Sequence, residues 1–167
     1  DILHARSAAH CAATMRLVAF MVRKRPAVLV ANLPRLAEAV VKSLDPTHTT
    51  MREAVVNAAT VMISELVSTY PSISFFGAGQ RLAVGTHEGA VIMYDLKTAT
   101  RLYVLEGHRR RADAVSFSPD GRRLVTMSLE EGRVLVWKTS SGFSSFFSPG
   151  QMPRQGATDA KLTDGAY

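Results

Sequence analysis

The chain has 167 residues, of which 47% are hydrophobic and 20% charged, so a packed core is expected and wholesale disorder is not. Its formal net charge of +6 is spread along the chain, which favours an ordinary solvated surface over the basic stripe of a nucleic-acid-binding protein. The one cysteine, Cys11, excludes an intramolecular disulfide, and the apolar run Leu17–Val22 is too short to span a membrane. The chain opens on Asp1 without an initiator Met or a signal pattern, which we interpret as an internal start or a fragment.

Two amphipathic helices are predicted before residue 45. Residues 4–25 carry apolar side chains at spacings of three and four, which places them on one face, and Pro26 breaks or restarts the chain. Residues 27–44 repeat this pattern and form the second helix. Pro34 falls inside it, so this proline lies either in a first turn, where its missing N–H costs nothing, or at a kink.

A third helix is predicted between Thr50 and Tyr70. Thr50 and Glu53 match a capping box, in which the hydroxyl accepts from the Glu N–H and the carboxylate reaches back to the Thr N–H. Helices joined by such short turns must bury their apolar faces on one another and on further helices. Residues 1–71 therefore resemble a HEAT- or armadillo-like helical array, with an ordinary three-helix bundle as the alternative.

One sequence unit occurs twice between residues 72 and 150. Its matching segments are 73–75 with 115–117 and 81–82 with 123–124 at an offset of 42, then 88–94 with 131–137 at an offset of 43 after one inserted Glu. A period of about 40–45 residues with four short strands is typical of a β-propeller blade. The predicted strands are 72–76, 80–85, 90–95 and 100–105 in the first copy and 112–117, 122–128, 133–138 and 143–147 in the second.

The predicted fold class is therefore α+β with a partial propeller. A helical segment, 1–71, precedes two four-stranded antiparallel blades, 72–107 and 108–150, and a flexible tail follows over 151–167. A propeller typically needs roughly four blades or more, so the remaining blades are expected from chain upstream of Asp1. Because an open pair of blades leaves strand edges unpaired, we expect the isolated chain to be unstable or to associate through those edges.

The second copy resembles a WD-repeat blade. The resemblance is carried by Gly107-His108 before the first strand, by the turn Ser116–Gly121 and by Trp137 at the end of the third strand. In that family a buried network links a His, a Ser or Thr, an Asp and the Trp, because a buried imidazole and indole N–H need partners. The resemblance implies four members here, with one alternative for the acid: His108, Ser128, Trp137 and Glu130, or Glu131 because of the insertion.

The first copy keeps less of this pattern. Thr86, Glu88 and Tyr94 stand at the corresponding positions, but a stretch of the third helix occupies the place of Gly-His. We therefore expect the network of the first blade to be incomplete. The second copy also departs from the family, because Glu replaces the preferred Asp and Lys138 replaces the Asp of the Trp-Asp pair.

Shorter stretches resemble one family of WD-repeat proteins more closely. Residues 81–86, 94–100, 105–108 and 149–150 are similar to the C-terminal region of the rabconnectin beta-subunit family, whose members are large proteins with propellers and an intervening helical region. This resemblance implies a regulator of vacuolar proton-pump (V-ATPase) assembly and activity, and so of vesicle acidification. It also implies a place in the cytoplasm or on the cytoplasmic face of vesicles. The implied partners are the rabconnectin alpha subunit and subunits of the pump.

Candidate catalytic and metal sites have better structural explanations. The chain lacks a Gly-x-Ser-x-Gly elbow, and His108 with Ser116 or Ser128 is explained by the blade network. His10-Cys11 lacks a second ligand pair for a metal, and residues 77–79 lack the Lys and helix of a phosphate-binding loop. We therefore predict a non-enzymatic protein without catalytic residues, cofactor or metal site.

Arg109, Arg110 and Arg111 form the one notable charge cluster, on a loop expected at one rim of the propeller. Contact with an acidic protein partner is the functional interpretation of this cluster, and a solvated loop is the alternative. Nucleic acid is not expected, because no aromatic residues interleave the arginines. The sequence thus predicts an interaction scaffold, by resemblance a proton-pump regulator. A generic WD-repeat adaptor in another complex is the alternative, and a basic nucleic-acid-binding module is a more distant one.

Overall fold

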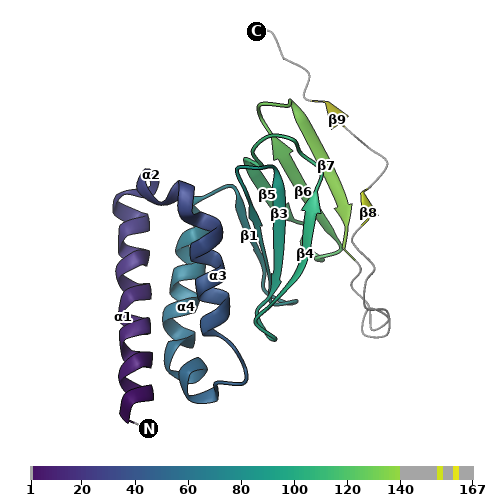
Figure 1. The fold of residues 1–167 in the computed structure, drawn as a ribbon. Coiled ribbons are helices and arrows are strands. Elements are labelled where there is room, and N and C mark those ends of the chain that lie inside the picture. The colour runs from purple at the N-terminus through teal and green to yellow at the C-terminus, as the bar shows by residue number, and fades with distance from the viewer. Residues whose placement is uncertain (1, 140–153, 156–159, 162–167) are drawn as a thin grey trace, which may run out of the picture.

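The computed structural model of the protein describes residues 2–139, 154–155 and 160–161, and its fold is α+β. Figure 1 shows α1 (Ile2–Lys24) at one end, α3 (Leu33–Ser43) and α4 (Thr49–Thr69) in the middle, and two antiparallel sheets beyond them. The helices and the first sheet thus form successive layers that lead to the second sheet. This arrangement is consistent with a helical segment followed by part of a WD-like propeller.

The helices follow the predicted apolar periodicity, with one subdivision. The first predicted helix corresponds to α1, and Pro26 opens the short helix α2 (Pro26–Leu29). The second predicted helix is divided into α2, a 3₁₀ turn η1 (Val30–Asn32) and α3. Pro34 lies in the first turn of α3, which is the first of the two predicted alternatives, because a proline there removes no intrahelical hydrogen bond.

The predicted capping box at Thr50 is wrong. Helix α4 begins at Thr49 with His48 as its N-cap residue, and no side chain caps it. The Arg52 N–H donates to the His48 carbonyl at 2.9 Å, so the helix already includes Thr50 as an interior residue. The preceding turn is fixed instead by Asp45, whose carboxylate accepts the Thr47 N–H at 2.9 Å and the Thr47 hydroxyl at 2.7 Å.

Helix α1 packs along α4 through small side chains. The buried face of α1 consists largely of alanines, which allow the two backbones to approach closely: Ala8, Ala12, Met15, Ala19 and Val22. An ion pair between Arg23 and Glu65, 3.3 Å apart, joins the same two helices. The Tyr70 hydroxyl donates to the Pro26 carbonyl at 2.7 Å and ties the end of α4 to the α1–α2 corner. The predicted HEAT- or armadillo-like array is not confirmed by this packing.

We call the first sheet blade one. Its strands pair antiparallel in the order β1 (Ile73–Phe76), β2 (Arg81–Gly85), β3 (Ala90–Asp95) and β4 (Thr100–Glu106). All four lie within two residues of the predicted bounds. The antiparallel meander follows from short apolar segments joined by tight turns, such as the turn before β2, where Gln80 adopts a positive φ of 52°.

We call the second sheet blade two. It contains β5 (Ala114–Phe117), β6 (Arg123–Ser128) and β7 (Arg133–Lys138), and two short strands, β8 (Arg154–Gln155) and β9 (Ala160–Lys161), both pair with β7. The predicted fourth strand, 143–147, lies outside the described residues. The place beside β7 is taken by β8 and β9, which come from the segment predicted as a flexible tail, because β7 offers its free hydrogen-bonding edge there.

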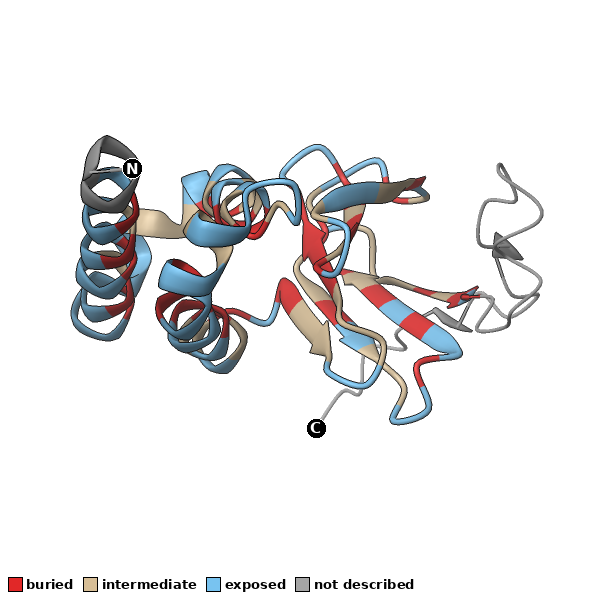
Figure 2. Cartoon of the chain, turned by 90° about the horizontal axis from the view of Figure 1, so that it is seen from below, coloured by how far each residue is buried: buried red, intermediate tan, exposed pale blue. Residues whose placement is uncertain are grey.

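Blade one is the middle layer of the molecule and is buried on both faces. Along β2, Leu82 and Val84 belong to the core shared with the helices, whereas Ala83 belongs to the core shared with blade two. This division follows from the period of two in a strand, which sends alternate side chains to opposite faces. The helices therefore cover one face of blade one, and blade two covers the other (Figure 2).

Candidate functional site

A buried polar network lies inside blade two. The Trp137 indole N–H donates to the Thr126 hydroxyl oxygen at 3.0 Å, and that hydroxyl lies 2.9 Å from His108 Nε2. Thr126 is fully buried, and His108 and Trp137 are 7% and 5% exposed. A hydroxyl oxygen accepts two hydrogen bonds and donates one, so the single Thr126 hydroxyl serves as partner to both the indole N–H and His108 Nε2. The network joins β6 and β7 to the loop that precedes β5 and so fixes their register.

Glu131 connects this network to the arginine loop. Its carboxylate accepts the backbone N–H groups of Arg109 and Arg110, the latter at 2.6 Å, and lies 3.5 Å from His108 Nδ1. Burial raises the pKa of Glu131, but the Arg110 and Arg109 N–H groups and the nearby His108 lower it by more than burial raises it. The net pKa of Glu131 is therefore below its ordinary value. An ionised Glu131 therefore holds the loop backbone in place at neutral pH.

The structure brings His108 and Trp137 together but not Ser128 or Glu130. Ser128 is fully buried, and its hydroxyl has no hydrogen-bond partner among the described residues. Glu130 is exposed, and its carboxylate lies 4.0 Å from Arg110 Nε. The inserted residue places Glu131, the predicted alternative, beneath the loop. Thr126 was missed, although it shares one strand face with Ser128 and lies two residues nearer to Trp137 along the paired strands.

Blade one has no corresponding network. Thr86 is buried without a partner for its hydroxyl among the described residues, and Glu88 is exposed. Tyr94 is 3% exposed against the helical core, where burial and the nearby Glu38 carboxylate raise its pKa. Val84 occupies the repeat position of Thr126, so the first blade lacks the hydroxyl that joins the rings in the second.

The arginine loop is packed firmly against blade one. Gly89, with a φ of 91°, approaches the His108 and Arg110 carbonyls too closely for any side chain, and the Ala112 N–H donates to the Thr86 carbonyl at 3.0 Å. The loop backbone is therefore held from both sides, by blade one and by Glu131.

The three arginine side chains of this loop differ in their surroundings. Arg111 Nε lies 3.4 Å from Asp113, and Arg110 reaches Glu130 only at 4.0 Å, so both have acidic neighbours. Arg109 is exposed and forms no ion pair within the described part of the chain. The predicted contact between this cluster and an acidic partner thus depends mostly on Arg109, and it stays a prediction.

The outer face of blade two has a counterpart in blade one. The apolar side chains on this outer face are Val125, Met127, Val134 and Val136, and Val125 is 36% exposed. At the repeat positions in blade one stand Ala83, Gly85, Val91 and Met93, which are buried beneath blade two. The same face of the repeat is therefore covered by a sheet in one blade and open in the other within the described residues.

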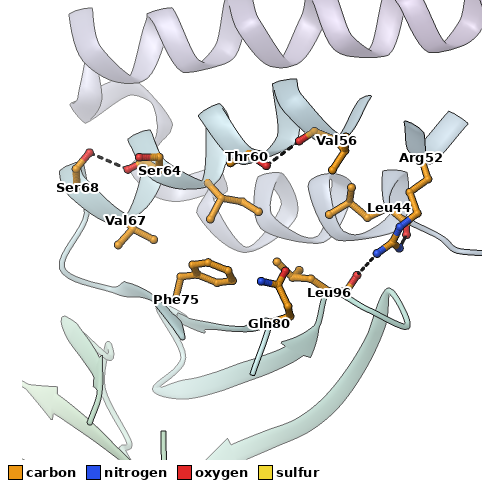
Figure 3. A pocket seen from close by; sticks show the side chains of 11 residues that line it. Leu44, Arg52, Val56, Thr60, Ser64, Val67, Ser68, Phe75, Gln80 and Leu96 are labelled. Atoms are coloured by element: carbon orange, nitrogen blue, oxygen red, sulfur yellow. Dashed lines mark hydrogen bonds between the residues drawn. The ribbon is translucent and has the colours of Figure 1, made fainter. Parts of the chain in front are cut away.

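A groove of about 500 Å³ lies between α4 and the turns of blade one. Figure 3 shows Val67 and Phe75 turned toward the groove, with Arg52 at one end. The Arg52 guanidinium donates to the Leu44 carbonyl and, at 3.3 Å, to the Leu96 carbonyl, so it bridges the helices and blade one. Arg52 is the one charged residue in the lining, so the groove offers apolar contacts and no acid–base pair.

The described residues contain no group of three or more His, Cys, Asp or Glu side chains that could hold a metal ion. In the same part of the chain, none of the helices has the length and apolar character that crossing a membrane requires.

The paired blades are consistent with part of a WD-like propeller, and the chain is similar to WD-repeat proteins at low identity and partial coverage. No family model matches the chain. Periodic tryptophan protein 2 of Saccharomyces cerevisiae is 33% identical over 73 residues, which are 43% of this chain and 8% of that protein.

Two further relatives carry the repeat in their names. WD repeat-containing protein SL1-17 of Schistosoma mansoni is 36% identical over 70 residues, 42% of this chain and 23% of that protein. The WD repeat-containing protein sll1491 of Synechocystis is 28% identical over 76 residues, 46% of this chain and 22% of that protein. The chain thus spans less than a quarter of the length of these relatives, and a specific likeness to the rabconnectin family is not among the findings.

Proposed function

We propose that this chain is part of a non-enzymatic WD-repeat adaptor, whose blades present a rigid surface to other proteins. The observation that carries the proposal is the outer face of blade two. In blade one the equivalent face is buried beneath a sheet, whereas in blade two Val125 and its neighbours remain accessible among the described residues. An accessible apolar sheet face of this kind serves as an interface with another folded unit.

The internal network supports the same proposal. His108, Thr126 and Trp137 contact one another through the Thr126 hydroxyl, and Glu131 accepts hydrogen bonds from the loop backbone. These residues therefore stabilise the blade rather than assemble a nucleophile beside a base. A rigid blade with a firmly held rim loop is a suitable support for binding residues. In this proposal Arg109 is the rim residue that contacts an acidic side chain of a partner.

The finer assignment is to the vacuolar proton pump. The stretches 81–86 and 94–100 support it by their resemblance to the rabconnectin beta-subunit family. In this proposal the full protein regulates pump assembly on the cytoplasmic face of vesicles, together with the alpha subunit. The helices would belong to a longer HEAT- or armadillo-like array, and further blades of the full protein would complete the propeller. A WD-repeat adaptor of another complex is the alternative, and the named relatives support this alternative and not the pump.

Affinity capture with the full-length protein tests both levels of the proposal. We expect Val125→Asp on the outer face to lose co-purifying proteins that the unmodified protein retains. Leu129→Asp is the matched control, because Leu129 is 63% exposed in the β6–β7 turn and lies off that face. Equal recovery with both variants, once circular dichroism shows that they are folded, would overturn the adaptor proposal. Recovery of partners without any pump or alpha subunit would reject only the finer assignment.

A further inference from the structure

Helix α1 carries two side-chain seams on opposite faces. The buried seam, described above, packs against α4. The opposite seam contains Ala13, Leu17, Phe20 and Lys24, at spacings of four, three and four, with Met21 beside it. Figure 2 shows this division, with the buried residues of α1 on the side toward the other helices and exposed residues on the outer side. Alternating spacings of three and four are the pattern by which one helix packs along another.

The outer seam carries several large apolar side chains that are exposed to solvent. Leu17 is 60% exposed, Phe20 50% and Met21 37%, and Val28 at the adjoining corner is also 60% exposed. Single exposed apolar residues are common on protein surfaces, but several that adjoin on one helix face indicate an interaction surface.

The charge around this seam is of one sign. Residues 2–25 contain five cationic side chains and not a single Asp or Glu: Arg6, Arg16, Arg23, Lys24 and Arg25. Arg23 is paired with Glu65 of α4. Arg16, Lys24 and Arg25 are exposed, and none of them forms an ion pair within the described residues. Lys24 Nζ lies instead 5.9 Å from the centre of the Phe20 ring.

We propose that the outer seam of α1 binds an amphipathic helix of a partner protein that carries carboxylates along its apolar face. The exposed apolar residues supply the buried contact, and Lys24 and Arg16 pair with the carboxylates. The seam from Ala13 to Lys24 is about 16 Å long at 1.5 Å per residue, so it matches about three turns of a partner helix.

A helical partner accounts for the seam better than a membrane surface does. Lys24 is the last residue of α1 and stands in line with Leu17 and Phe20, so its ammonium continues the apolar stripe rather than flanking it. A membrane-binding helix keeps its cations on the polar face, because an ammonium among inserted side chains is costly to dehydrate. A carboxylate of a partner helix instead meets this ammonium directly, in the way that charged positions select a partner in coiled coils.

The inference deepens the proposed adaptor function, on which it rests, by assigning a partner class to the helical layer. The test measures binding of synthetic helical peptides to the full-length protein by fluorescence anisotropy. One peptide of about 20 residues has Leu at its a and d positions and Glu at the flanking e and g positions, and a second has Lys in place of each Glu. We expect micromolar binding of the Glu peptide and at least about tenfold weaker binding of the Lys peptide.

Protein variants then locate the site. Lys24→Glu should weaken binding of the Glu peptide by about tenfold and improve binding of the Lys peptide. Arg35→Glu, a charge reversal at an exposed residue of α3, should leave the affinity for both peptides unchanged. Leu17→Glu should abolish binding while circular dichroism shows an intact fold. Equal binding of both peptides, or an unchanged affinity of Lys24→Glu, would overturn the inference.

Other occupants of the seam give different results. Co-sedimentation of the protein with phosphatidylserine vesicles that is lost in Leu17→Glu would assign the seam to a membrane and overturn the inference. Self-association that is lost in the same variant would assign it to a second copy, with the same consequence. If the peptides fail to bind while Val125→Asp still loses its partners, the inference fails and the adaptor proposal stands.

Discussion

The two blades share one sequence repeat but hold their strands together by different means. Blade two encloses the hydrogen-bonded group His108, Thr126 and Trp137. At the repeat positions of the last two, blade one has Val84 and Tyr94, which pack among apolar side chains of the helical core. A buried network and a dry core are therefore alternative solutions for the same strand geometry.

The difference follows from which element packs beside each blade. A loop with Gly107-His108 reaches blade two, and Gly107 leaves room for the Trp137 ring, because a Cβ there would lie 2.6 Å from it. Helix α4 packs against blade one with apolar side chains, so a polar group on that face would have no hydrogen-bond partner. The covering element thus decides whether the repeat keeps its polar network.

Removing the indole from blade two should have the largest effect. Trp137→Ala deletes a ring that is 5% exposed and takes a hydrogen-bond donor from Thr126. We expect a loss of about 3–5 kcal/mol in the free energy of unfolding, measured by urea denaturation of the chain. A loss below about 1 kcal/mol would mean that blade two does not depend on its network.

Exchanging the central residues of the two blades should have intermediate effects. Thr126→Val keeps the shape but leaves the Trp137 N–H and His108 Nε2 buried without a partner, at an expected cost of about 1–3 kcal/mol. Val84→Thr is the matched change in blade one and should also destabilise, by about 1–3 kcal/mol, because it buries an unpaired hydroxyl. If Val84→Thr were neutral in urea denaturation, the dry core of blade one would not be a requirement.

Neutralising Glu131 should cost about 1 kcal/mol at neutral pH, because two backbone N–H groups lose a charged acceptor. The pKa of Glu131 is lowered in the folded state, so its contribution is present above the unfolded value of about 4.3. That contribution is lost as the pH falls through the lower folded pKa. The stability of Glu131→Gln should therefore depend less on pH below about pH 4.3.

Glu130→Gln provides the control for this prediction, because Glu130 is an exposed neighbour that no backbone N–H of the loop reaches. It should change the free energy of unfolding by less than about 0.5 kcal/mol at any pH. Equal pH profiles for Glu130→Gln and Glu131→Gln would contradict the assignment of Glu131 to the loop.

Features that depend on short-range patterns were predictable from the sequence. Residues that alternate at a period of two, as Val91 and Met93 do, predict strands. The Ser118–Gly121 turn follows from its local hydrogen bonds. The position of Pro34 was narrowed to two alternatives, and only the packing of α3 on its neighbours decides between them.

Features set by contacts between distant segments were not predictable in the same way. Thr126 and Ser128 share one strand face, and only the approach of His108 and Trp137 in space selects the former. The capping box at Thr50 failed because Asp45 fixes the preceding turn and lets the helix begin earlier. The pairing of β8 and β9 with β7 joins residues whose spacing carries no repeat signal.

The smallest effect is expected from removing the Tyr94 hydroxyl in blade one. No hydrogen bond of this hydroxyl is found among the described residues, in contrast to the Trp137 N–H, so Tyr94→Phe should change stability by less than about 0.5 kcal/mol at pH 7. Burial raises the pKa of Tyr94 in the folded state, so the folded protein favours the neutral phenol. The stability that this preference contributes is present below the unfolded value of about 10 and is lost as the pH rises through the folded pKa. Tyr94→Phe should therefore lose less stability than the unmodified chain in urea denaturation above about pH 10, and a larger alkaline loss would show that Tyr94 does have a polar partner.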